Sequence, residues 1–236
     1  FTFTVLDLAG AEARKRLLVP VAVLQTVAAN LGSMLTPIGN PQNLYLYGKA
    51  GLSPGAFLRL MLPYTLASLL LVLVWSAVQT RGYDGSIEVA FAEKVRLSDK
   101  KAQLAAYLLL FVLALLTVAR VLPCGLTLVL TAAGLLLADR SIFRRVDYGL
   151  LLTFAGFFIF IGNMGRLPAF YGLLQRIVSG HELLAGAAAS QVISNVPAAL
   201  LLSGFTEDLS ALIVGVNIGG LGTLIASMAS LISYGW

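Results

Sequence analysis

The stretch ANLGSMLTPIGNPQN, residues 29–43, decides the fold of this 236-residue chain. It lies within residues 17–48, a run that contains no charged side chain. A helix crosses a bilayer in about 20 residues, so this run is too long for one straight span. Its centre is rich in Asn, Gly, Ser, Thr and Pro, which interrupt helices and offer oxygen atoms. The stretch therefore predicts a helix broken inside the membrane, either around a bound ligand or at an unusual packing joint.

The composition of the whole chain is that of an integral membrane protein. Hydrophobic residues make up 58% and charged residues 11% of the sequence, whereas soluble domains carry about 25% charged residues. The net charge of +5 bears on loop topology, because the Lys and Arg residues form no basic stripe that would bind nucleic acid. The chain opens on FTFTVLDL without Met and ends on SLISYGW. We expect a fragment that lacks N-terminal helices and the extreme C-terminus.

Seven uncharged runs predict an all-α, polytopic helical bundle. Four of them fit one helix each: 60–80, 102–119, 121–138 and 148–165. The last run, 209–236, is again too long for one straight helix and has polar residues at its centre. The sixth, 183–206, has Ser194 and Asn195 at its centre, and each arm is about half a bilayer long. This pattern favours a re-entrant hairpin, although the run could instead span the membrane.

Charged segments separate the runs and organise the predicted domain. Segments 12–16, 81–101 and 139–147 hold most of the Lys and Arg residues, as expected for cytoplasmic loops. We predict a single transmembrane domain over 1–236. Within it, 1–80 is the remainder of a first repeat, 81–101 is a linker that could include an amphipathic surface helix, and 102–236 is a second repeat.

An internal repeat relates the two long runs. NLGSMLTPI, residues 30–38, aligns with NIGGLGTLI, residues 217–225, and Gly39-Asn40 then faces Ala226-Ser227. Paired interrupted hydrophobic segments in two halves of a chain point to the binding site of a transporter. If 183–206 is a hairpin, the two broken helices run antiparallel as an inverted repeat; if it spans, they are parallel.

The residues at the breaks suit an anion and a cation. Asn40 before Pro41 predicts a helix start, Ser194-Asn195 before Pro197 predicts another, and Ser227 predicts a third cap. Helix N-termini attract negative charge, so we expect an anionic substrate to contact Asn40, Asn43, Ser190, Ser194, Asn195, Pro197 and Ser227. Hard oxygen donors suit an alkali cation, for which we expect Asn30, Gly32, Ser33, Thr36, Gly39, Asn217, Gly219 and Thr223.

Other interpretations remain open at this stage. The small residues could only allow close helix packing, which accounts for Gly156, Gly186 and Ala187–Ala189 but poorly for the Asn, Gln and Pro residues at matching depth. The seven runs contain no Asp, Glu, Lys, Arg or His. We therefore expect no cofactor and no metal beyond a coupling ion, which is Na⁺, or H⁺ if the proton site lies outside this chain.

ANLGSMLTPIGNPQN, SQVISNVPAAL and NIGGLGTLIAS resemble the ion transporter superfamily. This group includes sodium-coupled di- and tricarboxylate carriers, arsenite efflux pumps and Na⁺/H⁺ antiporters. The resemblance implies an inverted-repeat scaffold with a mobile transport domain, usually as a homodimer. It places Ser194 and Asn195 at a substrate-binding Ser-Asn-Thr tip, with Val196 in place of Thr, and it places the first hairpin's tip before Phe1. Asn40 replaces an Asp of some relatives, which favours an anion carrier.

The sequence thus predicts a secondary active transporter of a small anion, a di- or tricarboxylate, that is coupled to Na⁺ or H⁺ and works by alternating access. The alternatives are an arsenite or oxyanion efflux permease, a Na⁺/H⁺ antiporter and a passive channel. An enzyme is not expected, because the runs supply no nucleophile–base pair or carboxylate dyad. We expect a multi-pass homodimer in a bacterial or archaeal inner or plasma membrane.

Overall fold

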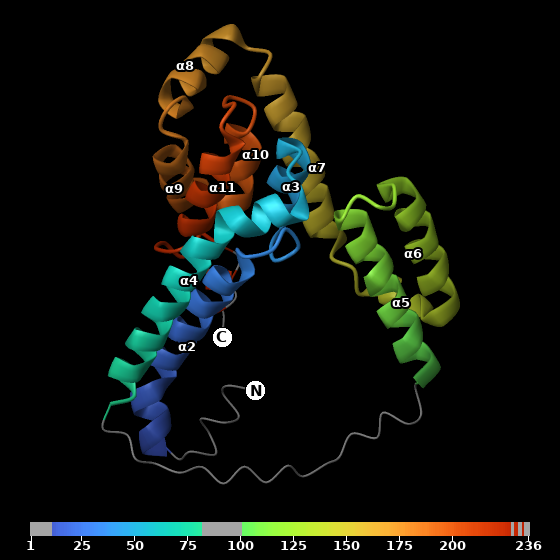
Figure 1. The fold of residues 1–236 in the computed structure, drawn as a ribbon, viewed down its shortest axis with the longest axis horizontal. Helices are drawn as coiled ribbons and strands as arrows, with labels where there is room; N and C mark the ends of the chain where they lie inside the picture. The colour runs from blue at the N-terminus through green and yellow to red at the C-terminus, as the bar shows by residue number, and fades with distance from the viewer. Residues whose placement is uncertain (1–10, 82–100, 228, 231–232, 234–236) are drawn as a thin grey trace. The chain divides into compact units, whose positions relative to one another are not determined.

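The computed structural model describes residues 11–81, 101–227, 229–230 and 233, and all regular structure among them is helical (Figure 1). The chain divides into two compact units, one of Phe1–Val89 with Gly156–Trp236 and one of Ala90–Ala155. The helices are α2 (Ala11–Ser33), α3 (Pro41–Ala50), α4 (Pro54–Gln79), α5 (Lys101–Val118), α6 (Cys124–Ala138), η2 (Arg140–Arg144), α7 (Tyr148–Met164), α8 (Pro168–Val178), α9 (Glu182–Ile193), α10 (Asn195–Leu202) and α11 (Leu209–Ile218).

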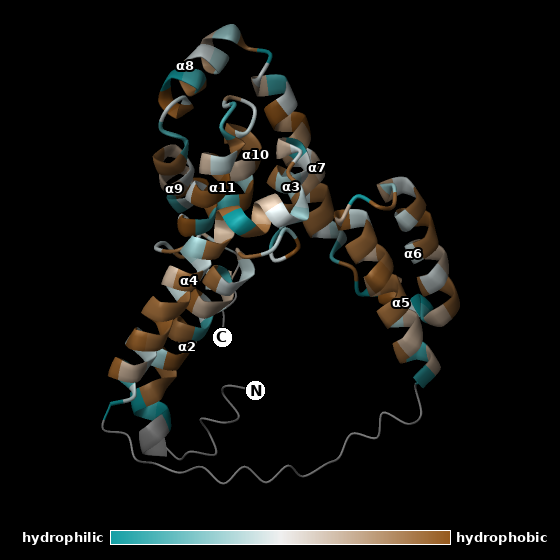
Figure 2. Cartoon of the chain, in the orientation of Figure 1, coloured by the Kyte–Doolittle hydropathy of each residue, from teal (hydrophilic) through white to brown (hydrophobic). Residues whose placement is uncertain are grey.

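The smaller unit is built on α5 and α6, which pack side by side (Figure 1). A hydrogen bond between the hydroxyls of Thr117 and Thr127 joins one pair of ends, and Tyr107 donates to Asp139 Oδ2 at the other. The side-chain and backbone donors of Ser141 lower the pKa of Asp139, which lies outside the helices. Most of the remaining surface of α5 and α6 is apolar (Figure 2), as expected for helices that face lipid.

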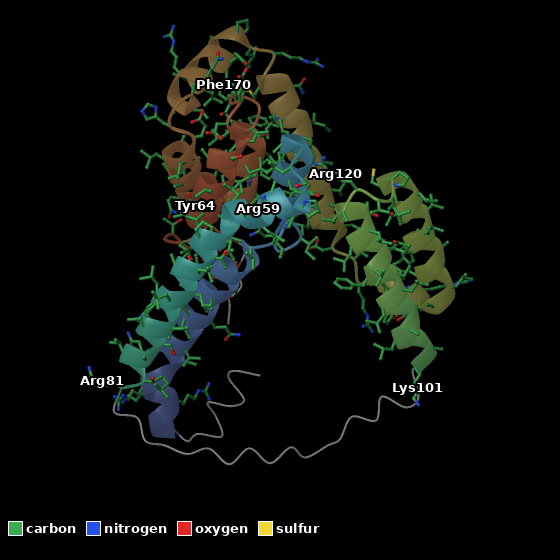
Figure 3. All side chains as sticks on the ribbon, in the orientation of Figure 1. Arg59, Tyr64, Arg81, Lys101, Arg120 and Phe170 are labelled. Atoms are coloured by element: carbon green, nitrogen blue, oxygen red, sulfur yellow. The ribbon has the colours of Figure 1, made fainter. Side chains whose placement is uncertain are left out.

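The larger unit holds its core where α3 and α9–α11 meet. Its completely buried apolar side chains include Met34, Leu46, Phe57, Leu212 and Ile213. By contrast, α4 exposes Leu residues around its circumference, and α2 and α4 pack side by side (Figure 2). Arg81 follows the C-terminal end of α4, and Lys101 is the first residue of α5 (Figure 3). At helix ends, basic side chains can reach water.

The four runs predicted as single helices are confirmed as α4, α5, α6 and α7. The first of them starts earlier than the run, because Ser53 Oγ accepts a hydrogen bond from Ala56 N and caps α4. Among the described residues, Arg14–Ser33, α4 and α5 are long and apolar enough to cross a membrane. The linker with its predicted surface helix falls largely on 82–100, outside the described residues.

An amphipathic helix that the sequence reading left out follows α7. The pair α7 and α8 would pass as one span by composition, but α8 bends away by 103°. Phe170 (Figure 3) and Tyr171 on α8 pack against Phe205, with ring centroids 6.0 and 5.3 Å apart. A short helix with one apolar side, turned sharply from the preceding span, has the pattern of a segment lying along a membrane surface.

The predicted hairpin is confirmed as α9 and α10. Glu182, which begins α9, accepts a hydrogen bond from Thr206 Oγ1 beyond α10 at 2.9 Å, so the two ends of the run meet. The chain reverses at Ser194, whose φ of 75° and ψ of 154° are rare for a residue with a side chain. The backbone N–H groups of Glu182 and Gly180 hold the pKa of the Glu182 carboxyl below its usual range.

Close helix contact seats α11 against α9. A Cβ on Gly215 would lie 2.3 Å from the carbonyl oxygen of Leu183, and one on Gly219 would lie 2.7 Å from Cα of Ala187. Residue numbers rise together along both helices, so α11 runs parallel to α9, and it ends beside Ala187 and Ser190, before the hairpin tip. The packing role predicted for Gly186 also holds, whereas a Cβ on Gly156 would meet nothing within 4 Å.

Candidate functional site

Three interruptions of helical structure meet within the larger unit. They are the first break, residues 34–40 between α2 and α3; the second break, residues 219–227 after α11; and the hairpin tip at Ser194. The tip is docked on the second break, because Asn195 N donates to the carbonyl oxygen of Ala226 at 3.0 Å. The three interruptions, which the sequence predicts to line one site, therefore meet at one junction.

The two breaks contact each other through a reciprocal pair of hydrogen bonds. Asn30 Nδ2 donates to Ser227 Oγ at 2.8 Å, and Asn40 Nδ2 donates to Asn217 Oδ1 at 3.2 Å. In the repeat alignment Asn30 corresponds to Asn217 and Asn40 to Ser227, so exchanging the halves converts one contact into the other. Residue numbers rise from Asn30 to Asn40 in the first stretch, while those of their partners fall from Ser227 to Asn217 in the second. The broken helices are thus antiparallel, and the inverted repeat is confirmed.

The predicted caps are confirmed at two of the three helix starts. Asn40, in extended conformation, accepts from Asn43 N at 3.2 Å at the start of α3. Ser227 Oγ accepts from Ser230 N at 3.2 Å, which is the same relation in the second repeat. The start of α10 falls at Asn195 as predicted, but the side chain of Ser194 makes no capping hydrogen bond. Helix N-termini therefore face the junction, where they favour negative charge.

Asn43 and Asn217 hold the first break together from inside. Asn43 Nδ2 donates to the carbonyl oxygens of Met34 at 3.2 Å and Thr36 at 3.3 Å. Its Oδ1 accepts from Asn217 Nδ2 at 2.6 Å. Both side chains are buried. These amides supply the partners that an interrupted helix would otherwise lack within a membrane.

Gln191 supports the second break from the hairpin. Its Nε2 donates to the carbonyl oxygens of Gly219 at 2.7 Å and Leu221 at 2.6 Å, and its Oε1 accepts from Thr223 N at 2.9 Å. Thr223 Oγ1 in turn donates to the Gln191 carbonyl oxygen at 2.8 Å. Gln191 is not among the predicted site residues. It directly follows Ser190, and these two polar residues, about one turn before the tip on an otherwise apolar arm, are the signal that indicates it.

The residues predicted to contact the anion occupy different surroundings. Ser190 is completely buried at the α9–α11 contact, where its hydroxyl donates to the Gly186 carbonyl. Ser194 and Pro197 are half-buried at the tip. Asn195 is 6% exposed, and its side-chain Nδ2 lies 3.1 Å from where a Cβ on Gly220 would stand. The amide of Asn195 has no hydrogen-bond partner among the described residues.

The residues predicted to hold a cation lie in the two breaks and the helix turns that lead into them. Several of their oxygens already accept hydrogen bonds: Ser33 Oγ from Asn40, the Thr36 carbonyl from Gly39 and Asn43, and the Gly219 carbonyl from Gln191. Gly32 is exposed in the last turn of α2. A Cβ at Gly39 would stand 1.7 Å from the Ser33 carbonyl oxygen, so any residue other than glycine would require the backbone to move.

Comparison with known proteins relates the chain to membrane transporters. The CitMHS family model, described as "Citrate transporter", matches residues 2–229. Over 216 residues the chain is 34% identical to "Inner membrane protein YbiR" of Escherichia coli (strain K12), which covers 89% of the chain and 56% of that protein. Over 215 residues it is 37% identical to "Uncharacterized transporter MJ0456" of Methanocaldococcus jannaschii, again 89% and 56%. The chain thus spans about half the length of these relatives. No solved structure matches it.

Proposed function

The chain belongs to the citrate transporter family, and from this premise we propose that it carries the substrate site of a secondary active transporter for a small anion, a di- or tricarboxylate, coupled to Na⁺ or H⁺. The observation that carries the proposal is the junction of two antiparallel broken helices with a hairpin tip. Interrupted helices at the interface of inverted repeats are the usual construction of such sites.

The chemistry of the junction favours an anion as the transported species. The starts of α3 and α10 bring the positive ends of two helix dipoles to it. Asn195 offers a side-chain amide without a partner among the described residues, and an amide can donate to a carboxylate oxygen. Among the described residues, no group of three His, Cys, Asp or Glu side chains could hold a metal ion. We expect neutral donors and helix ends to carry the binding.

The way the parts are joined supports the proposal of alternating access. The hairpin is bonded to the second break through Gln191 and Asn195, and the second break to the first through Asn30 and Asn40. We expect these parts to move as one body against the lipid-facing helices, in a homodimer within a bacterial or archaeal plasma membrane.

Uptake into proteoliposomes that contain the full-length protein tests this function. Na⁺ and pH gradients are imposed separately, with citrate, succinate, sulfate and arsenite as substrates. We expect saturable uptake of a carboxylate, driven by one of the two gradients. Transport of arsenite alone would show an oxyanion permease, exchange of Na⁺ for H⁺ without an anion would show an antiporter, and flux without saturation or counterflow would show a channel. Each of these results would overturn the proposal.

Asn195 provides the residue-level test. Replacing its unpartnered amide with Ala removes a substrate contact without breaking an internal hydrogen bond. We expect Asn195→Ala to lower the affinity for the anion about tenfold to a hundredfold while the melting temperature in detergent stays unchanged. Asn163→Ala, at an exposed position near the end of α7, is the matched control. Wild-type uptake by the Asn195 variant would remove this residue from the site.

A further inference from the structure

Gln42, the second residue of α3, carries an unusual buried oxygen. The residue is 1% exposed. Its Oε1 is buried and has no hydrogen-bond partner among the described residues. Buried acceptors are nearly always paired in proteins, because an unpaired one loses its hydration without compensation. A bound water or a ligand could supply the donor that the described residues do not.

The neighbours of Gln42 on α3 show which way its side chain faces. Tyr45 and Lys49 lie three and seven residues further on, so they share a helix face with it. Both contact Ser203 Oγ just beyond α10, Tyr45 through its hydroxyl at 3.0 Å and Lys49 through Nζ at 3.1 Å. Gln42 accordingly lies on the face of α3 that packs against α10.

The level of Gln42 along that face is set by contacts at both ends. The C-terminal ends of α3 and α10 meet at Ser203. At the N-terminal end of α3, Asn217 of α11 bonds Asn40 and Asn43. Gly220, three residues after Asn217, lies at the N-terminal end of α10, because a Cβ on it would stand 3.1 Å from Asn195 Nδ2. The two half-helices therefore run parallel and start together, which puts Gln42 level with the first turns of α10. The buried residues there include Val196 and Ala199, which offer no side-chain donor.

We propose that Gln42 is a specificity-determining residue of the anion site, whose Oε1 accepts a hydrogen bond from a hydroxyl group of the transported anion. The inference rests on the proposed function and extends it. An ionised carboxylate is an acceptor only, so it cannot satisfy Oε1. The carboxylates go to the helix N-termini and to Asn195, and the hydroxyl goes to Gln42. The site thereby distinguishes hydroxylated from unhydroxylated anions of equal charge.

Pairs of anions that differ only in one hydroxyl test this assignment. Malate is compared with succinate, and citrate with tricarballylate, as competitors of uptake by the full-length protein. For the wild type we expect the hydroxylated member to bind about tenfold to a hundredfold more tightly. Gln42→Met keeps the length of the side chain but removes the acceptor. We expect it to abolish the preference, leave the affinity for the unhydroxylated anion unchanged, and unfold at the same or a higher temperature.

Gln42→Glu is the companion variant, because it retains an acceptor and adds a charge. We expect it to keep the hydroxyl preference while binding all anions more weakly. Gln175→Met, at an exposed position on α8, is the control and should change nothing. A preference retained in Gln42→Met overturns the proposal. If that variant alters only the Na⁺ or pH dependence, the oxygen belongs to the coupling ion. If it only lowers the unfolding temperature, the oxygen holds a structural water.

The wild type separates this inference from the function on which it rests. Absence of carboxylate uptake would overturn the proposed function and the role of Gln42 together. Carboxylate uptake without a hydroxyl preference would overturn the role of Gln42 alone.

Discussion

The two breaks are related by sequence but are supported in different ways. The first is held mainly from within its own repeat: Asn43, on the helix that follows it, bonds the Met34 and Thr36 carbonyls and is completely buried, and Asn217 of α11 donates to Asn43. The second is held from the hairpin by Gln191, and its residues 222–225 are exposed. A repeat can therefore preserve a break while its support moves to another element. The first break should therefore keep its shape without the hairpin, whereas the second should depend on it.

Gly39→Ala should have the largest effect, because it changes the first break at its tightest point. The added methyl would overlap the Ser33 carbonyl, and backbone cannot move aside as a side chain can. We expect a loss of more than about 3 kcal/mol of stability, seen as loss of folded protein in detergent. Gly32→Ala, where a Cβ meets nothing within 4 Å, should be tolerated. Equal behaviour of the two variants would contradict the tight approach.

Removal of the two supporting amides compares the breaks directly. Asn43→Ala leaves the buried Met34 carbonyl without its donor and removes one acceptor of Asn217, so we expect a cost of about 2 to 3 kcal/mol. Gln191→Ala exposes groups in a break that is already open, so we expect about 1 kcal/mol, together with a marked loss of transport rate. Thermal unfolding and uptake measured on the same preparations check both. A larger stability loss for Gln191→Ala would reverse the comparison.

The smallest effect should come from acid acting at the base of the hairpin. The folded state lowers the pKa of Glu182, so its contribution is present above the unfolded pKa and fades as the pH falls toward the folded value. Melting temperatures measured between neutral pH and acid should fall less steeply for Glu182→Gln than for the wild type. Because this carboxylate joins Thr206 to α9, the loss should appear in the hairpin and second break first. If the melting temperatures of the two proteins fall equally with pH, the Glu182 carboxylate does not stabilise the base of the hairpin.

Local chemistry predicted the places where helices stop and start, and long-range contacts decided the rest. Asn40 followed by Pro41 specifies a helix start with no help from the fold, and the structure agrees. The sequence does not reveal that Asn43 bonds the first break, that Gln191 bonds the second, or that Gln42 Oε1 has no hydrogen-bond donor among the described residues. An amide side chain has the same chemistry in each case, and only its neighbours in space distinguish them. The sequence does not predict α8, because Arg166 and Arg176 keep its residues outside the uncharged runs.

Ser194 lowers the conformational stability of the hairpin tip. Its backbone occupies a region that is essentially reserved for glycine, at a cost of about 1 to 3 kcal/mol. A turn selected only for its shape would contain glycine and would be more stable. With Ser at this position, the most strained residue of the hairpin carries a hydroxyl at the place where the hairpin meets the second break. If the tip binds the substrate as proposed, stability and activity are opposed there, and stabilising substitutions at Ser194 should weaken transport.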